Sequence, residues 1–197
     1  MSIDYKTKSI ESDRLILSKG TLNDYLSVYE YDFGKLRDID GEFEYCKNNL
    51  AEIEKWFKPT TEEFYLKCEK NHVFDWVIYL KDSIQPIGNI VADRENMETN
   101  GIEISFNLHP NYWGTGYMPE TIIVVMNYLF ELGFENIIYG YDDGNIKSKK
   151  VSEKLGFKEF RIKKSDWVKN GKPIDVYETI MAKEKWLSET EKRVEKC

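Results

Sequence analysis

The stretch GIEISFNLHPNYWGTGYMPETI, residues 101–122, contains the features that decide the fold. Its first eight residues, Gly101–Leu108, alternate between apolar and polar side chains, as expected of a half-buried β-strand. Pro110 cannot donate a hydrogen bond to a neighbouring strand, so the strand should end just before it. A loop with two glycines leads into a long apolar segment, Tyr117–Leu132, which predicts a mostly buried helix that ends at Gly133.

The loop between this strand and helix has the composition of an anion-binding turn. Gly114 and Gly116 let the backbone bend and expose successive N–H groups beside a helix N-terminus, which is an arrangement that holds a diphosphate. Pro119 fits the first helical turn, where N–H groups have no partner inside the helix. A tight turn without a ligand explains two glycines equally well. The dinucleotide fingerprint fails, because Pro119 stands where its third glycine should be, and a P-loop ending of Gly-Lys-Ser/Thr is absent.

The rest of the chain predicts an α+β fold. Further helices are predicted over Thr21–Tyr31, Glu42–Phe57, Thr60–Lys70 and Asn145–Leu155. Further strands are predicted over Arg14–Leu17, Val73–Leu80, Ile87–Asp93, Asn136–Tyr141, Phe157–Lys163 and, after a turn at Asn170-Gly171, Asp175–Ala182. We expect a mixed, mostly antiparallel sheet of about seven strands with about four helices packed on it. We expect one domain over residues 1–197, of which 183–197 form a charged, helix-prone tail.

Charge and composition exclude several classes of function. The chain has 28 Lys and Arg against 35 Asp and Glu, a net charge of −7. We expect no nucleic-acid partner, because phosphate binding needs a clustered basic face. The longest apolar stretch, Ile122–Met126, is too short to cross a bilayer, and no apolar leader precedes Lys19, so we expect a cytoplasmic location and no membrane. The three cysteines are scattered and the two histidines lie near no cysteine pair, so we expect no metal.

Two segments, HPNYWGTGYMPETI (109–122) and GNIKSKKVSEKLGFKEF (144–160), resemble the GNAT superfamily of acyl-CoA-dependent N-acetyltransferases. The sequence looks most like the branch that contains the ribosomal-protein N-terminal acetyltransferases, whose opening strand matches RLIL at 14–17. The resemblance implies a GNAT-like fold and the transfer of an acetyl group from acetyl-CoA to a primary amine, with a protein N-terminus as first choice. A small-molecule amine (polyamine, aminoglycoside or amino acid) is the alternative acceptor, and a non-catalytic CoA-binding sensor is the alternative outside enzymes.

The resemblance also implies which residues hold acetyl-CoA. The family's Gln/Arg-x-x-Gly-x-Gly/Ala loop, whose backbone holds the pyrophosphate, corresponds to Asn111, Tyr112, Trp113, Gly114, Thr115 and Gly116. Asn111 replaces the leading Gln or Arg, which removes a side chain but none of the backbone donors. The end of the preceding strand would pair with the pantetheine arm, which implies Phe106, Asn107 and Leu108, with a backbone N–H near Phe106 for the developing oxyanion. The asparagine that touches CoA from the later helix corresponds to Asn145.

Acetyl transfer needs a base for the incoming amine and a donor for the departing thiolate. In the family a carboxylate on the strand often deprotonates the amine through water, which implies Glu103. Many members place a tyrosine donor seven residues after the asparagine, where this chain has Ser152, whereas the ribosomal-protein branch uses a serine three residues after it, here Ser148. At 100° per residue Asn145, Ser148 and Ser152 fall within about 60° of arc, so all three can face one ligand. Glu103 and Ser148 are the predicted catalytic residues.

Two charged groups have a functional and a plain interpretation. Lys147, Lys149 and Lys150 are either a solvated helix face or a contact for the 3′-phosphate of CoA. The acidic residues within 38–44 lie where this family usually receives its substrate and would attract a cationic amine. The predicted partners are therefore acetyl-CoA and an amine acceptor, and the protein is expected to be a monomer or a homodimer.

Overall fold

The computed structural model describes residues 3–29, 60–169 and 172–194. The helix expected over Glu42–Phe57, the acidic residues within 38–44 and the Asn170-Gly171 turn lie outside these residues.

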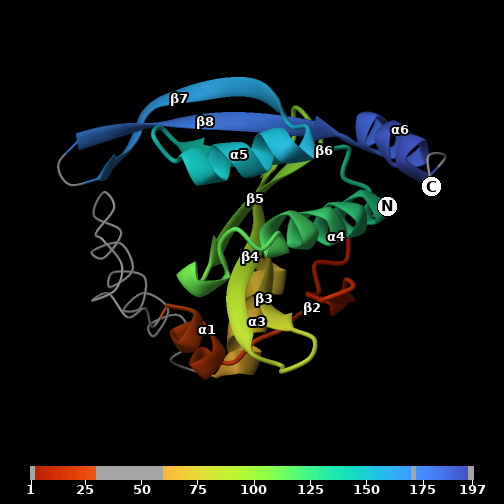
Figure 1. The fold of residues 1–197 in the computed structure, drawn as a ribbon, viewed down its shortest axis with the longest axis vertical. Helices are drawn as coiled ribbons and strands as arrows, with labels where there is room; N and C mark the ends of the chain where they lie inside the picture. The colour runs from red at the N-terminus through yellow and green to blue at the C-terminus, as the bar shows by residue number, and fades with distance from the viewer. Residues whose placement is uncertain (1–2, 30–59, 170–171, 195–197) are drawn as a thin grey trace. The chain divides into compact units, whose positions relative to one another are not determined.

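One mixed sheet of eight strands contains every described strand (Figure 1). The strands are β1 (Ile10–Glu11), β2 (Leu15–Ser18), β3 (Phe74–Leu80), β4 (Pro86–Asn96), β5 (Gly101–Leu108), β6 (Asn136–Asp142), β7 (Lys158–Lys169) and β8 (Lys172–Ala182), in the spatial order β1-β2-β3-β4-β5-β6-β8-β7. The pair β5/β6 is parallel, while β1/β2, β2/β3, β6/β8 and β7/β8 are antiparallel. The prediction of a mixed, mostly antiparallel sheet is confirmed.

Five α-helices and one short 3₁₀ helix lie in the described residues. They are α1 (Leu22–Tyr29), α3 (Thr61–Lys70), α4 (Tyr117–Leu132), α5 (Ile146–Leu155), α6 (Lys183–Val194) and η1 (Pro110–Tyr112). The predicted start of α3 is confirmed, because the Thr60 side chain accepts a hydrogen bond from the N–H of Glu63 at 3.1 Å. The predicted bounds of α4 and β5 are both confirmed to the residue, and Gly133 follows α4 with a left-handed φ of 110°.

The chain forms two compact units that are interleaved along the sequence. The first comprises Met1–Asp4, Ala92–Ser105 and Val125–Cys197, and the second comprises Tyr5–Val91 and Phe106–Val124. In the second unit, an aromatic cluster that includes Tyr25, Phe64 and Tyr65 is buried against Val77. In the first unit, Ile102 and Ile104 of β5 and Tyr139 of β6 are at most 1% exposed.

Two parts of the chain differ from the sequence-based expectation. The two-residue strand β1 was not expected, because it is defined by its pairing with β2 and not by a pattern of its own. Strand β7 continues to Lys169, six residues beyond the predicted end, with register shifts against β8 and a left-handed Ser165. The charged tail contains α6, in agreement with the expectation that it is helix-prone.

Candidate active site

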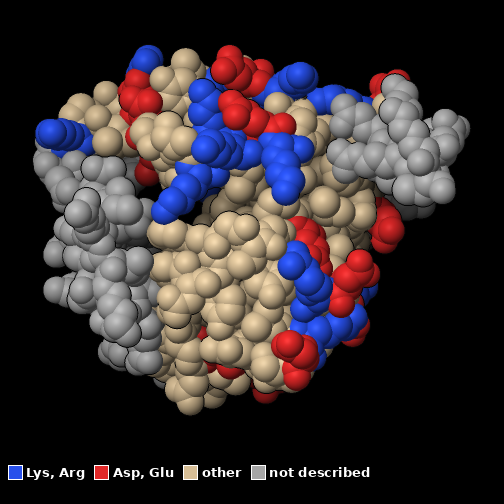
Figure 2. All heavy atoms as spheres, in the orientation of Figure 1, with Lys and Arg blue, Asp and Glu red and all other residues tan. Residues whose placement is uncertain are grey.

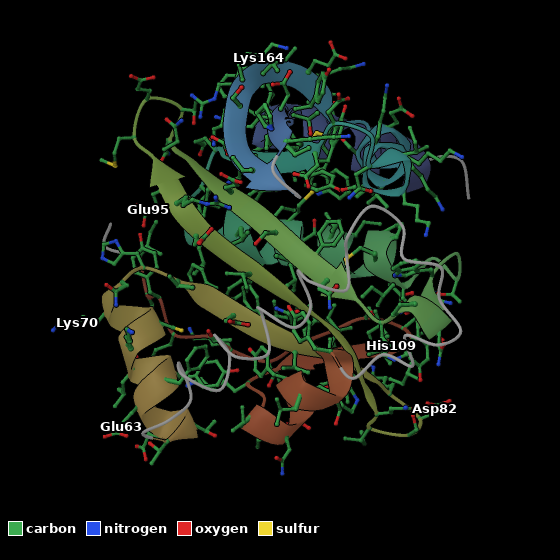
Figure 3. All side chains as sticks on the ribbon, turned by 90° about the vertical axis from the view of Figure 1, so that its left-hand side faces the viewer. Glu63, Lys70, Asp82, Glu95, His109 and Lys164 are labelled. Carbon is green, nitrogen blue, oxygen red and sulfur yellow. The ribbon has the colours of Figure 1, made fainter. Side chains whose placement is uncertain are left out.

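The loop after β5 belongs to the second unit and is held by hydrogen bonds within that unit. The N–H of His109, at the end of β5 (Figure 3), donates to the carbonyl of Ile87 at 2.8 Å. The His109 ring nitrogen Nδ1 accepts from the N–H of Asn111 at 3.2 Å. The half-buried indole of Trp113 donates to the carbonyl of Leu108 at 2.7 Å. These bonds anchor the first part of the loop to β4 and β5, so the indole of Trp113 is a support of the loop.

The two glycines of this loop adopt left-handed backbone conformations. Gly114 has φ 77° and Gly116 has φ 85°, a region that side chains with a Cβ disfavour. The hydroxyl of Thr115 donates to the carbonyl of Tyr112 at 2.6 Å, so it does not cap α4. Among the described residues, none accepts a hydrogen bond from the N–H groups of Thr115, Gly116 and Tyr117. Three unpartnered donors at the positive end of a helix can hold an anion such as a phosphate group.

Arg14, which directly precedes β2, holds this loop. Its Nη1 donates to the carbonyl of Thr115 at 3.3 Å, and its guanidinium lies 4.3 Å from the ring centre of Tyr117. Its Nε and Nη2 lie 2.7 and 2.6 Å from Glu120 in the first turn of α4. Glu120 also accepts from the hydroxyl of Ser12 at 2.7 Å. Sequence reasoning missed the contact of Arg14 with the loop, because the two lie about a hundred positions apart in the chain.

Electrostatics keep Glu120 ionised beside the helix start. Burial by itself raises the pKa of Glu120, but hydrogen bonds from Ser12 and Arg14 outweigh it, so the net pKa is lowered. Glu120 therefore neutralises the guanidinium of Arg14. The backbone donors of the loop, and not a free cation, are the groups that remain for an anion.

Glu103 belongs to the first unit and lies in a charged cluster. Its side chain is 12% exposed, and Oε1 lies 2.9 Å from Nη2 of Arg94 on β4. Burial raises the pKa of Glu103 above its ordinary value, although Arg94 and Lys163 partly offset this, while Glu178 and Asp93 raise it further. A carboxylate with a raised pKa is a stronger base than an exposed one, so the predicted base has a suitable environment.

Glu178 on β8 lies on the same face of the sheet. It is 1% exposed and forms ion pairs with Lys163, at 2.5 Å, and with Arg161. Between the two glutamates lies Gly140 of β6. A Cβ there would lie 3.6 Å from Oε1 of Glu103 and 4.0 Å from Cγ of Glu178. The missing side chain leaves room between the two carboxylates.

The first turn of α5 is capped by Asn145, as its residue type predicts. Oδ1 of the exposed Asn145 accepts from the N–H of Ser148 at 3.1 Å. Because the side-chain oxygen is engaged in the cap, its amide nitrogen is the group that can contact a ligand.

Ser148 and Ser152 have different surroundings. The hydroxyl of Ser148 forms a hydrogen bond with the hydroxyl of Tyr139 on β6, which also lies 3.0 Å from the Ser148 carbonyl oxygen. Ser152 is 2% exposed, and its hydroxyl lies 2.9 Å from that of Thr179 on β8. The expectation that Asn145, Ser148 and Ser152 can all face one ligand is therefore wrong for Ser152, because its hydroxyl is directed into the core.

Glu103 and Ser148 lie on opposite faces of the β5/β6 pair. Glu103 is paired with Ile138 in parallel register and shares its face, whereas Tyr139, the next residue, contacts Ser148 on the other face. The β5/β6 pairing covers four residues of each strand and ends at Ile104 and Tyr139.

A group of lysines covers the outer face of α5. Lys147, Lys149 and Lys150 are exposed, and Figure 2 shows basic side chains gathered over this helix. Lys149 lies 3.9 Å from Glu153, a loose pair. In the described ranges no group of three or more His, Cys, Asp or Glu could hold a metal ion, and no helix there is long and apolar enough to cross a membrane.

Comparison with known proteins gives a consistent family. A family model described as an acetyltransferase (GNAT) domain matches residues 14–158. The uncharacterized N-acetyltransferase YoaA of Bacillus subtilis is 26% identical over 178 residues, which cover 89% of this chain and 98% of that protein. The uncharacterized N-acetyltransferase C18E5.08 of Schizosaccharomyces pombe is 35% identical over 77 residues, 39% of this chain, and the match spans only 41% of the length of that relative.

Solved structures share the fold. The ribosomal-protein-S5-alanine acetyltransferase from Vibrio fischeri superposes with a TM-score of 0.65 at 18% sequence identity. The match covers 91% of this chain and 98% of that protein. The microcin C7 self-immunity acetyltransferase MccE, in complex with acetyl-CoA and AMP, has a TM-score of 0.67 at 13% sequence identity. The match covers 87% of this chain and 93% of that protein. At these identities the likeness establishes the fold.

Proposed function

Because the chain belongs to the GNAT family of acetyltransferases, we propose that it transfers an acetyl group from acetyl-CoA to a primary amine. The observation that supports this most directly is the loop before α4, where three consecutive backbone N–H groups have no partner among the described residues. A pyrophosphate needs such donors and does not need a cationic side chain. The left-handed Gly116 fits the same role, since this turn disfavours a residue with a Cβ, and a Cβ there would lie 3.5 Å from Nη2 of Arg14.

Each predicted cofactor-binding residue has a proposed place. Residues 111–116 would hold the pyrophosphate through their backbone, with Trp113 as an internal support. Phe106, Asn107 and Leu108 at the end of β5 would pair with the pantetheine arm. The amide nitrogen of Asn145 would contact CoA while its oxygen caps α5.

The chemistry is direct attack of a neutral amine on an activated thioester, so no acyl-enzyme is required. Glu103 would accept the proton of the amine through water, and its raised pKa supports that role. Ser148 would donate a hydrogen bond to the departing thiolate. Because these two residues lie on opposite faces of β5/β6, a reacting thioester meets both only beyond Ile104 and Tyr139, where the pairing ends.

We propose a protein N-terminus as the acceptor, supported by the resemblance to the ribosomal-protein branch. A small-molecule amine is the second candidate, supported by the fold shared with MccE, whose solved structure holds acetyl-CoA and AMP.

An acceptor screen tests the proposal. The protein is incubated with acetyl-CoA and N-terminal peptides, polyamines, aminoglycosides or amino acids, and free thiol is measured. We expect thiol release that requires both the protein and one acceptor class, and acetylated product by mass spectrometry. Calorimetry that detects no CoA affinity would refute the whole proposal. CoA binding without turnover of any amine would instead favour a sensor.

A further inference from the structure

The buried phenol of Tyr139 is a polar group that the predicted mechanism leaves without a task. Tyr139 lies on β6, is 1% exposed, and packs edge-on against Phe157 with ring centres 5.7 Å apart. Its hydroxyl lies within hydrogen-bonding reach of two oxygens of one residue, the hydroxyl and the carbonyl of Ser148. A buried phenol needs a partner, and here its partner is the residue proposed as donor to the thiolate.

Counting protons shows why this contact matters. Two hydroxyls meet, and each has one proton. If the phenol donates to the Ser148 carbonyl, the serine proton can be directed back to the phenol oxygen and is not available to a ligand. If the phenol donates to the Ser148 hydroxyl oxygen, the serine proton is left for another acceptor. The carbonyl of Ser148 lies inside α5, where the N–H four residues later is its regular partner, so it does not depend on the phenol.

We propose that Tyr139 is a positioning residue for Ser148. Its phenol donates to the Ser148 hydroxyl oxygen, so that the serine directs its own proton to the CoA sulfur. This inference rests on the proposed function. No proton leaves Tyr139, because burial raises the pKa of its phenol and the hydrogen bond with Ser148 only partly offsets this. A hydroxyl that accepts one hydrogen bond donates a stronger one, so the phenol also improves Ser148 as a donor.

The chain offers a matched pair of variants. Tyr139→Phe removes only the phenolic oxygen and keeps the ring. Tyr141→Phe makes the same change two residues along the same strand, on a ring that stacks on Tyr177 at 5.6 Å. Among the described residues no hydrogen bond of the Tyr141 hydroxyl is found. Each variant is compared with Ser148→Ala and with the double variant Tyr139→Phe/Ser148→Ala, after thermal unfolding and CoA affinity have been measured.

Turnover is the first measurement. We expect Tyr139→Phe to lower kcat about tenfold, the size of one lost hydrogen bond, with the KM for acetyl-CoA unchanged. The double variant should be no slower than Ser148→Ala, and Tyr141→Phe should match the wild type. A Tyr139→Phe variant with wild-type kcat, or one that slows Ser148→Ala further, would overturn the proposal.

The second measurement needs no acceptor. The thiol of protein-bound CoA is titrated by its thiolate absorbance. A hydrogen bond from Ser148 stabilises the thiolate and lowers the thiol pKa, so Ser148→Ala and Tyr139→Phe should raise it by similar amounts and Tyr141→Phe should not. If no amine is acetylated, the proposed function fails while this titration still decides the role of Tyr139. An unchanged thiol pKa in Tyr139→Phe contradicts the positioning role.

Discussion

The first turns of α4 and α5 were both expected to contact CoA, but they present opposite chemistry. At α4 the N–H groups of Thr115, Gly116 and Tyr117 have no partner among the described residues, because the Thr115 hydroxyl bonds within the loop. At α5 the side chain of Asn145 occupies the first turn. An uncapped helix start binds an anion through its backbone N–H groups. In a capped one the first turn is already hydrogen-bonded, so only side chains are available for a ligand. The loop before α4 should therefore govern affinity for CoA, while residues around α5 and β6 should govern turnover.

The largest expected effect is on the open helix start. Gly116→Val should weaken CoA binding about a hundredfold, because the valine disfavours the φ of 85° and crowds the guanidinium of Arg14, which holds the loop. Calorimetry measures the affinity. Gly133→Val is the matched control, since Gly133 is also left-handed, with φ 110°, and has open space around it at the other end of α4. Equal losses of affinity in both variants would show that backbone strain alone is responsible, and would contradict a role of the loop before α4 in binding CoA.

Glu103→Gln should lower kcat roughly 10²-fold while leaving CoA affinity unchanged. Only ionised Glu103 accepts a proton, and its pKa is raised above the ordinary 4.5. Wild-type kcat/KM should therefore fall as pH drops through this raised pKa, and the variant should lose that dependence. At high pH, free amine accumulates and part of the loss should be recovered. Identical pH–rate profiles for variant and wild type would remove Glu103 from the mechanism.

The two serines of α5 should have different effects when they are replaced. Ser148→Ala should lower kcat about tenfold with little change in acetyl-CoA affinity. Ser152→Ala should leave kcat unchanged and lower only stability, by about 1 kcal/mol, because its hydroxyl bonds to Thr179 in the core. Steady-state kinetics and thermal unfolding measure the two effects. A large kinetic defect in Ser152→Ala with an intact Ser148→Ala would place the donor at the position of the wider family's tyrosine.

The smallest effect concerns the cap itself. Asn145→Ala should lower stability by about 1 kcal/mol, the usual worth of an N-cap, whereas Asn145→Asp keeps the capping oxygen and should unfold near the wild-type temperature. Asp lacks the amide donor, so both variants should bind CoA more weakly, by a few-fold, if the amide contacts it. An Asp variant with full CoA affinity would make Asn145 a cap and nothing more.

Local patterns predicted the elements with a strong period. The alternation in β5 and the apolar surface of α4 predicted the first and last residue of both elements correctly. Burial of one face of an element dictates such a pattern. The predicted strand β7 was too short, since residues 164–166 are polar and the strand continues beyond Lys163 through its pairing with β8 and not through a pattern.

Residues of the candidate site could be predicted only where their role depends on neighbours in the sequence. The left-handed glycines and the Asn145 cap are local, so spacing and residue type identified them. Arg14 and Tyr139 act through contacts with Thr115 and Ser148, and no property of their own neighbourhood in sequence marks them. The burial of Ser152 was missed for the same reason. Helix geometry gives the direction of a side chain around the helix axis, but not which strand packs against that side of the helix.

The interleaving of the two compact units has a consequence for synthesis on the ribosome. Ile102 and Ile104 leave the ribosome before residues 136–139, which become the parallel neighbour of β5. Until then this strand has an apolar, unpaired edge, which is the kind of surface that chaperones bind and that aggregates. Neither unit is complete in the nascent chain until Val124 has been made, and the one that contains Glu103 waits for β8. Slow translation between 105 and 136 would therefore prolong the most vulnerable interval in the life of the chain.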